Sequence, residues 1–232
     1  MRNIITYDGK SSMDFGLYVG LNQNDNAPQR STEDIVVPGR NGTLTIDNGR
    51  YENIDVSYIC FIRYRFEDTI PAARNFFLAN SGYRRLEDSA HPEEYRMAKY
   101  KSGLEVTPSQ MRKQGYFTLT FNCMPQRFLK SGEIPLVFTG NGTIFNETMQ
   151  VAKPLIRVWG NGSLGIGENT ITLAGITDPY TDIDCESMDA YAAGENRNSN
   201  ISGAFPVLEP GTNGVSLSGV TKVEITPRWW IL

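Results

Sequence analysis

Residues 35–44 read Ile35-Val-Val-Pro-Gly-Arg-Asn-Gly-Thr-Leu44, and this stretch predicts two strands joined by a tight turn. Strand-forming residues lead into Pro-Gly and Asn-Gly pairs, and the chain then returns through Leu44 and Ile46. Glycine and asparagine accept the positive φ angles that such turns require. We therefore expect a β-hairpin whose turn contains Pro38, Gly39, Arg40, Asn41 and Gly42.

The C-terminal segment, residues 222–232, is the second informative stretch. Val223 and Ile225 alternate with polar residues, as in a strand, and Trp229 and Trp230 follow close to the end. Large aromatic side chains are costly to leave in water. We expect the segment to be docked on its own domain or on a neighbour, with at least one tryptophan well buried. The alternative is a flexible docking peptide for a partner.

The rest of the sequence repeats short strands and turns. Polar and apolar residues alternate in runs such as Ile54–Ile59, Tyr116–Phe121 and Thr170–Ala174, which is the period of a strand. Between the runs lie pairs that suit hairpin turns: Asp8-Gly9, Asn41-Gly42, Asn48-Gly49, Asn141-Gly142, Asn161-Gly162 and Asn213-Gly214. The pattern predicts a mainly β protein built from sandwiches or barrels.

One helix is expected within the first half. Asp68 or Thr69 can cap its start, Pro71 fits its first turn, and Gly82 lies just past its end. One face is apolar, which predicts packing against a sheet; it contains Ile70, Ala73 and Phe77, with Phe76 beside them. The alternative role of the aromatic pair, Phe76 and Phe77, is to bind in the groove of a partner.

A domain boundary is predicted between Pro125 and Glu133. The strand pattern Gly115–Cys123 ends before it, and Ile134-Pro135 restarts a β pattern after it. No helix signal follows. We therefore expect an α+β domain over residues 1–130 and an all-β sandwich over residues 131–232.

The composition argues against several classes of function. The 232 residues carry a net charge of −4 and no basic run, which disfavours nucleic-acid binding. No apolar run approaches the length of a membrane span, and the first residues lack the core of a signal peptide, so we expect synthesis in a cytoplasm. With His91 as the single histidine and Cys60, Cys123 and Cys185 far apart, we expect buried free thiols, no cofactor and no enzyme activity.

Three segments are candidates for ligand binding. The acidic stretch Asp178–Asp189 has the carboxylates for calcium, but its alternation favours a strand with a solvated acidic face, so no metal site is predicted. The glycine-rich Gly160–Gly167 lacks the ending of a phosphate loop and predicts a hairpin with Asn161-Gly162 at its tip. Trp159, with Arg157 and Asn161, is the candidate sugar contact, and burial in a core or interface is its alternative role.

The order of several motifs resembles the distal tail protein of siphovirus-type phages and of prophages in Gram-positive bacteria, over nearly the whole chain. The motifs are Val37-Pro-Gly-Arg-Asn-Gly-Thr-Leu44 with Gly49-Arg-Tyr-Glu52, Leu86–Arg96, Phe117–Pro125, Lys153–Gly160, Asp189-Ala-Tyr191, Phe205–Gly211 and Pro227-Arg-Trp-Trp230. The resemblance makes the hairpin turn and the paired tryptophans candidate interface residues.

The resemblance implies a β-sandwich-like ring domain with one helix and a protruding hairpin, followed by a galectin-like β-sandwich. It further implies a homohexameric ring in the baseplate of the virion tail, assembled in the host cytoplasm. The ring would join the tail tube protein to the tail-associated tip protein and to receptor-binding proteins for host adsorption. The alternatives are a carbohydrate-binding β-sandwich module for attachment to the host surface and, ranked last, a cell-wall hydrolase.

Overall fold

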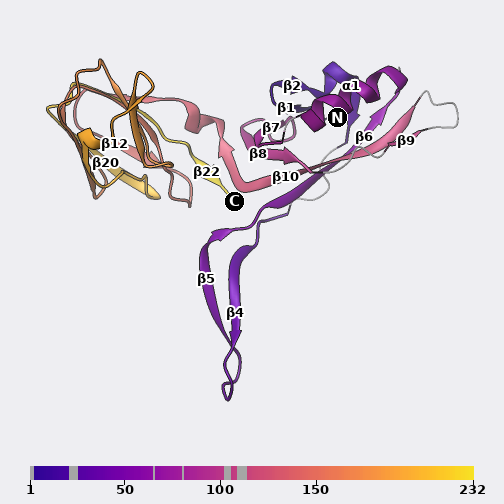
Figure 1. The fold of residues 1–232 in the computed structure, drawn as a ribbon, viewed down its shortest axis with the longest axis horizontal. Helices are drawn as coiled ribbons and strands as arrows, with labels where there is room; N and C mark the ends of the chain where they lie inside the picture. Colours follow the sequence, from indigo (N-terminus) through magenta and orange to yellow (C-terminus); the bar gives the residue numbers. More distant parts are fainter. Residues whose placement is uncertain (1–2, 21–25, 65, 80, 102–105, 109–113) are drawn as a thin grey trace. The chain divides into compact units, whose positions relative to one another are not determined.

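The computed structural model describes residues 3–20, 26–64, 66–79, 81–101, 106–108 and 114–232. The chain divides into a first compact unit that runs to Arg127 and a second that spans Phe128–Ile231. Within these ranges it is mainly β with one α-helix, as the sequence predicts (Figure 1). The division falls beside the predicted boundary, but independent folding of residues 1–130 and 131–232 stays a prediction. No helix in the described ranges has the length and hydrophobicity needed to cross a bilayer.

The first unit is built on one curled antiparallel sheet. Its strands follow the order β2-β1-β7-β8-β10-β6-β3, and β9 adds to β10. A bridge between Asn3 and Val19 links the start of the chain to the last strand of this path, so the sheet curls toward closure. The strands are β1 (Ile5–Tyr7), β2 (Lys10–Ser11), β3 (Leu17–Val19), β6 (Ile54–Ile62), β7 (Arg84–Asp88), β8 (Glu94–Tyr100), β9 (Val106–Pro108) and β10 (Gly115–Leu129).

The alternation in the sequence correctly identifies the inner face of β6 and β10. Every second residue of β6 from Ile54 to Ile62 is buried, and the register with β10 pairs Cys60 with Phe117 in the core. Strand β10 is longer than predicted and continues past Cys123. Its register with β6 stops at Cys123, so Pro125, which has no N–H to donate, lies beyond that ladder.

The helix α1 (Phe66–Ala79) begins earlier than predicted, so Pro71 lies inside it rather than in its first turn. Glu67 and Asp68 occupy the first turn, where negative charge favours the helix N-terminus. The predicted face is confirmed: Phe77 is buried, and its ring centroid lies 6.0 Å from that of Tyr7 in the sheet. The aromatic pair is therefore core packing. Short 3-10 helices are η1 (Ser12–Phe15), η2 (Lys130–Glu133) and η3 (Asn198–Asn200).

The predicted hairpin is confirmed as a protruding ribbon with its own two-stranded sheet, formed by β4 (Arg30–Val36) and β5 (Thr43–Tyr51). Ile35 pairs with Leu44 across it. Asn48-Gly49 does not form the predicted turn, because it lies inside β5, where Gly49 has φ 68° and the register shifts as in a β-bulge. Asn213-Gly214 likewise lies inside a strand rather than at a turn.

The second unit is a β-sandwich. One sheet has the order β11-β21-β13-β16-β17-β18, and the other has β12-β20-β14-β15-β19. Apolar residues from both sheets, such as Ile156 and Leu164, form its core. Its strands are β11 (Leu136–Phe138), β12 (Gly142–Asn146), β13 (Leu155–Trp159), β14 (Gly162–Ile166), β15 (Asn169–Leu173), β16 (Thr181–Asp184), β17 (Asp189–Ala192), β18 (Glu195–Asn196), β19 (Ile201–Gly203), β20 (Gly211–Ser218) and β21 (Lys222–Thr226). The last strand, β22 (Trp230–Ile231), belongs to neither sheet of the sandwich and pairs with β10.

The predicted hairpin at Asn161-Gly162 is wrong, because this pair carries the chain from one sheet of the sandwich to the other. Asn161 fastens the crossing: its amide donates to the carbonyl oxygen of Ile176 and accepts from the Ile176 N–H, both at 2.9 Å. Gly162 is required there, since it has φ 146° and a Cβ would lie 2.1 Å from the carbonyl oxygen of Ser218. The hairpin instead forms between β14 and β15.

Candidate assembly surfaces

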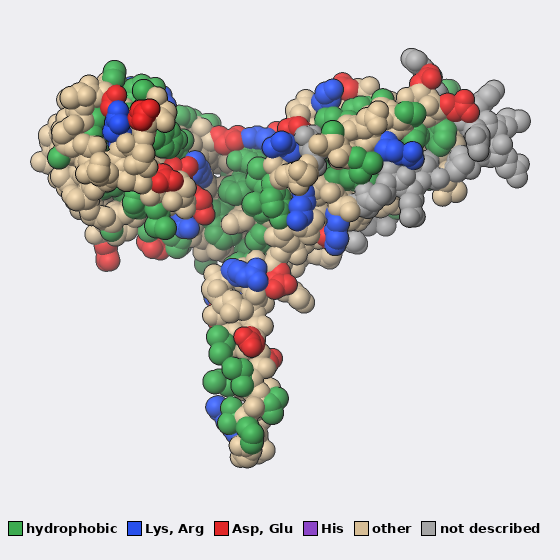
Figure 2. Space-filling model, viewed as in Figure 1, with side chains coloured by type: hydrophobic (Ala, Val, Ile, Leu, Met, Phe, Trp, Pro, Cys, Tyr) green, Lys and Arg blue, Asp and Glu red, His purple; other side chains and the backbone are tan. Residues whose placement is uncertain are grey.

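The ribbon β4–β5 carries aliphatic side chains that no sheet covers. Ile35 lies opposite Leu44, and Ile46 lies two residues further on the same face. We call these three residues the ribbon stripe; all of them are exposed, and Figure 2 shows hydrophobic side chains along the ribbon. A two-stranded ribbon has no second layer to bury such residues. They form an apolar surface that is available to a partner.

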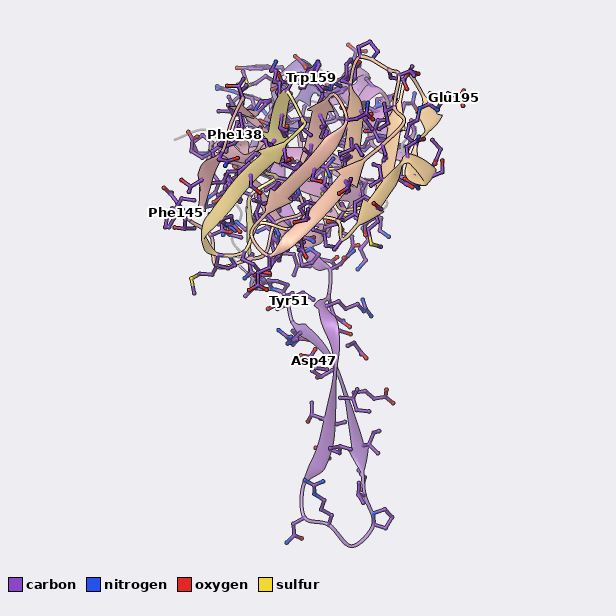
Figure 3. All side chains as sticks on the ribbon, turned by 90° about the vertical axis from the view of Figure 1, so that its left-hand side faces the viewer. Asp47, Tyr51, Phe138, Phe145, Trp159 and Glu195 are labelled. Carbon is purple, nitrogen blue, oxygen red and sulfur yellow. The ribbon has the colours of Figure 1, made fainter. Side chains whose placement is uncertain are left out.

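Polar contacts brace the base of the ribbon, where Asp47 and Tyr51 lie (Figure 3). Arg30 donates from Nε to Asp47 at 2.5 Å, and its guanidinium lies 5.4 Å from the ring centre of Tyr51. The N–H of Gly49 and the Arg30 side chain hold the pKa of Asp47 below its ordinary value. These contacts fix the base, while the ribbon stripe lies nearer the tip.

The tip brings together the five predicted turn residues, Pro38–Gly42, and all are exposed. Gly39 and Gly42 have φ near 80°, and a Cβ at either would meet no atom within 4 Å, so backbone conformation explains these glycines. Val36 beside the tip is 76% exposed. The tip is therefore a small apolar surface with one cation, Arg40.

The first unit has a second surface, partly exposed, that local sequence patterns do not predict. Tyr18 of β3, Phe61 of β6 and Tyr116 of β10 pair across neighbouring strands, and we call them the aromatic row. Ring centroids lie 6.3 Å apart for the first pair and 4.6 Å for the second. Tyr116 is 61% exposed, and Ile59 beside the row is 50% exposed. The alternation of polar and apolar residues indicates which face of the sheet each side chain occupies. It does not indicate that the three aromatic residues lie side by side, because that depends on the register between the strands.

The C-terminal segment is docked on the second unit, as expected. Trp229 and Trp230 pack against its core, the Trp229 carbonyl accepts from the N–H of Leu129, and the indole of Trp230 donates to the carbonyl of Val151 at 2.9 Å. The side chains of both tryptophans are only partly buried, so the prediction that at least one of them would be well buried is wrong. Both lie at the margin of the core rather than between its sheets, and the role of these residues in an interface stays a prediction.

The acidic stretch forms strand β16, but its predicted solvated acidic face is wrong. Asp182 is only 8% exposed and accepts two hydrogen bonds from Arg157, at 2.6 and 2.8 Å. Asp184 is held by Arg228 in the same manner. Arginine pairing explains why two carboxylates tolerate partial burial. Among the residues that the structure describes, no group of three or more His, Cys, Asp or Glu side chains is placed to hold a metal ion.

Trp159 lies on the outward face of the six-stranded sheet with Arg157, because Val158 between them points into the core. Its ring centroid lies 5.9 Å from that of Tyr180, and the ammonium of Lys222 lies 4.3 Å from the indole centre. Asn161 does not join this cluster, since its side chain holds the sheet crossing. The structure thus brings together two of the three residues nominated for sugar contact, and Lys222 covers part of the indole.

The cysteines offer no accessible nucleophile. Cys60, Cys123 and Cys185 are buried and free, as predicted. Burial raises the pKa of each thiol to about 12, so the reactive thiolate is scarce at neutral pH.

Comparison with solved structures gives full-length matches. The SPP1 Dit protein, described as a paradigm of the hub adsorption apparatus in phages that infect Gram-positive bacteria, has a TM-score of 0.77 at 13% identity and covers 100% of both chains. A chain of the phage p2 baseplate in its activated conformation, solved with strontium and with calcium, has a TM-score of 0.54 at 10% identity, covering 97% of this chain and 96% of that one.

No protein-family model matches the sequence, and no curated protein matches it. The match to the SPP1 Dit structure confirms the resemblance to distal tail proteins at the level of fold. Both the described chain and the expectation are mainly β, with one helix and a protruding hairpin in the first unit and a β-sandwich in the second.

Proposed function

We propose that this protein is the structural hub of a phage tail tip, a ring that joins the tail tube to the adsorption proteins of the baseplate. The observation that carries the proposal is the fold match to the SPP1 Dit protein over the full length of both chains. The match spans both units, so it rests on more than a common β-sandwich. In this role the protein is a non-enzymatic part of the virion tail, assembled from chains made in the host cytoplasm.

The first unit is the part that closes the ring, with six copies as in the family that the sequence resembles. The ribbon supports this assignment, because Ile35, Leu44 and Ile46 are exposed and need a partner to be covered. An edge of the ribbon can also extend a neighbour's sheet. In a closed ring each copy gives one contact and receives one, which leaves no copy with an open surface.

The remaining partners are the tail tube protein on one side of the ring and the tail-associated tip protein on the other. The second unit is the part that can hold receptor-binding proteins. Several exposed apolar residues support this assignment. Val137 and Phe145 lie on the edge strands β11 and β12, and Met149 and Val151 lie in the segment that follows β12. Figure 3 marks Phe145 at the margin of the sandwich.

The test is the oligomeric state of the purified full chain, measured by mass photometry at micromolar and higher concentrations. A hexamer, or a mixture of monomer and hexamer, is expected. Because ring contacts can be weak without neighbours, a second sample contains the tail tube and tip proteins from the same phage. A strict monomer under both conditions would contradict the proposal.

A second candidate, a carbohydrate-binding module, is supported by the cluster of Trp159, Tyr180 and Arg157 on one open sheet face. Aromatic rings beside hydrogen-bonding groups suit sugar recognition. The test is saturable binding on a glycan array that Trp159→Ala abolishes and Phe145→Ala leaves unchanged. Absence of saturable binding on cell-wall and common glycans would exclude this candidate.

A further inference from the structure

The chain contains five asparagine–glycine pairs, and the fold restrains them to different degrees. In such a pair the backbone nitrogen of the glycine can attack the side-chain amide of the asparagine, because glycine has no side chain to hinder the approach. The attack requires an amide that is able to rotate and a glycine N–H that is not held by an acceptor. The pairs are Asn41-Gly42, Asn48-Gly49, Asn141-Gly142, Asn161-Gly162 and Asn213-Gly214.

Two of the asparagines are held at both ends of their amide. The buried side chain of Asn213 accepts a hydrogen bond from the N–H of Glu209 at 2.9 Å and donates to the carbonyl oxygen of the same residue at 2.8 Å. Asn161 is bound to Ile176 in the same manner, with both hydrogen bonds at 2.9 Å. An amide that is held in this way does not turn its carbon toward the following nitrogen.

Asn48 and Asn141 are each restrained by a different hydrogen bond. The N–H of Gly49 donates to the carboxylate of Asp47 at 2.9 Å, so the nitrogen that would attack Asn48 is already engaged. The amide oxygen of Asn141 accepts from the N–H of Leu217 at 2.9 Å. Each of these two pairs must therefore break a hydrogen bond before it reacts.

The Asn41-Gly42 pair has neither kind of restraint. Both residues are exposed at the tip of the ribbon. Within the part of the chain that the structure describes, the Asn41 side chain and the N–H of Gly42 have no hydrogen-bond partner. Exposed loop tips are also the places where the backbone is most free to adjust. Of the five pairs, this one meets both requirements for the attack.

We propose that Asn41 is a site of spontaneous deamidation and that it is the pair that reacts in the folded chain. The backbone nitrogen of Gly42 forms a bond to Cγ of Asn41, the Cγ–Nδ2 bond breaks, and ammonia leaves with the proton of the Gly42 N–H. Water then adds to the cyclic imide and opens it at either carbonyl, which gives aspartate or isoaspartate. Water is the only co-reactant, and hydroxide speeds the reaction by removing the proton from the attacking nitrogen.

The reaction changes the charge and the backbone of the tip. Arg40 is the only charged residue between Ile35 and Ile46, so a new carboxylate beside it leaves the tip without net charge. Isoaspartate also lengthens the backbone by a methylene directly after the turn in which the N–H of Arg40 donates to the carbonyl of Val37 at 3.2 Å. This inference goes beyond the proposed hub and does not depend on the formation of a ring.

Peptide mapping of the purified full chain tests the site. The folded chain is incubated at mildly alkaline pH, and mass spectrometry follows the deamidated fraction at each of the five asparagines over time. Because the four restrained pairs react only through local opening of the structure, Asn41 should react about tenfold faster than any of them, or more. A folded chain in which another pair reacts as fast as Asn41 overturns the inference.

A denatured sample and two variants complete the test. In guanidinium chloride the advantage of Asn41 should shrink, because unfolding releases all five pairs. The same rate ratio in the folded and denatured chains would assign the reactivity to the neighbouring sequence and overturn the structural explanation. Asn41→Gln should remove the rapid reaction, and the matched control Asn141→Gln should retain it. Rapid deamidation that persists in Asn41→Gln also overturns the inference, and none of these outcomes bears on the oligomeric state.

Discussion

The guanidinium of Arg228 donates two hydrogen bonds to the carboxylate of Asp184, at 2.7 and 3.0 Å. This pair joins the C-terminal segment to strand β16 of the same sandwich. Arg228 adopts φ 60°, a left-handed conformation that is unusual for arginine, and its N–H donates to the carbonyl of Gly132. A Cβ at Gly132 would lie 2.3 Å from the nitrogen of Trp229, so the chain is tightly fitted here. The Arg228–Asp184 pair therefore anchors the C-terminal segment, which positions the indoles of Trp229 and Trp230.

Replacing Asp184 should reveal the strength of this anchor. Asp184→Asn keeps the shape but loses the charge, and we expect the free energy of unfolding to fall by about 1–3 kcal/mol. The same change at the exposed Asp189 is the matched control and should have little effect. Urea denaturation at neutral pH measures both. Equal stability of the two variants would contradict the anchoring role.

The same pair predicts a dependence on pH. Hydrogen bonds from Arg228 hold the pKa of Asp184 below its ordinary value of about 3.9, and the N–H of Glu186 adds to the effect. The stabilisation is therefore complete above the unfolded pKa and is lost as the pH falls through the lowered folded pKa. The stability difference between the native chain and Asp184→Asn should be constant from pH 7 to about pH 5 and should shrink below about pH 4. An unchanged difference at pH 2.5 would be the opposite result.

Removing residues 228–232 tests the docked segment as a whole. The deletion takes away the Arg228 anchor, the Trp230 indole bond and apolar area worth roughly 25 cal/mol per Å². We expect the melting temperature to fall by several degrees, at about 2–4 °C per kcal/mol, with increased aggregation. Should the truncated protein melt unchanged and lose only partner binding, the segment is a docking peptide.

The buried thiols should be inert in the native protein. Because burial raises each pKa to about 12, labelling with a thiol reagent at pH 8 should be slow until unfolding exposes Cys60, Cys123 and Cys185 together. Mass spectrometry after a brief pulse, with and without urea, counts the labelled sites. Rapid labelling of one cysteine in the absence of urea would show that its surroundings open locally.

Separate expression tests the predicted domains. Residues 1–130 and 131–232 should each unfold cooperatively, because each unit has its own core. A fragment that starts at Phe128 should melt above one that starts at Ser131, since only the longer fragment retains the bond from the Leu129 N–H to the carbonyl of Trp229. Circular dichroism melting curves of the three fragments provide the comparison. Unfolded halves would show that the units depend on each other.

Local patterns in the sequence predicted the features that depend on local chemistry. The hairpin at 35–44, the buried face of α1 and the alternation of β6 are set by turn residues and by periodicity within one element. The pair Asn161-Gly162 predicts a hairpin but forms a sheet crossing, because the same residues suit both and only the distant partner Ile176 distinguishes them. The pairing of Arg157 with Asp182 and the aromatic row also require strand register, which no local pattern supplies.

The ribbon also has a consequence for solubility. An exposed apolar strand segment promotes amyloid-like stacking, and charge or proline beside such a segment opposes it. Glu33 and Asp34 immediately precede Ile35, and Pro38 lies at the other end of the apolar run. In these positions the two acids and the proline oppose aggregation through the exposed apolar run of the ribbon.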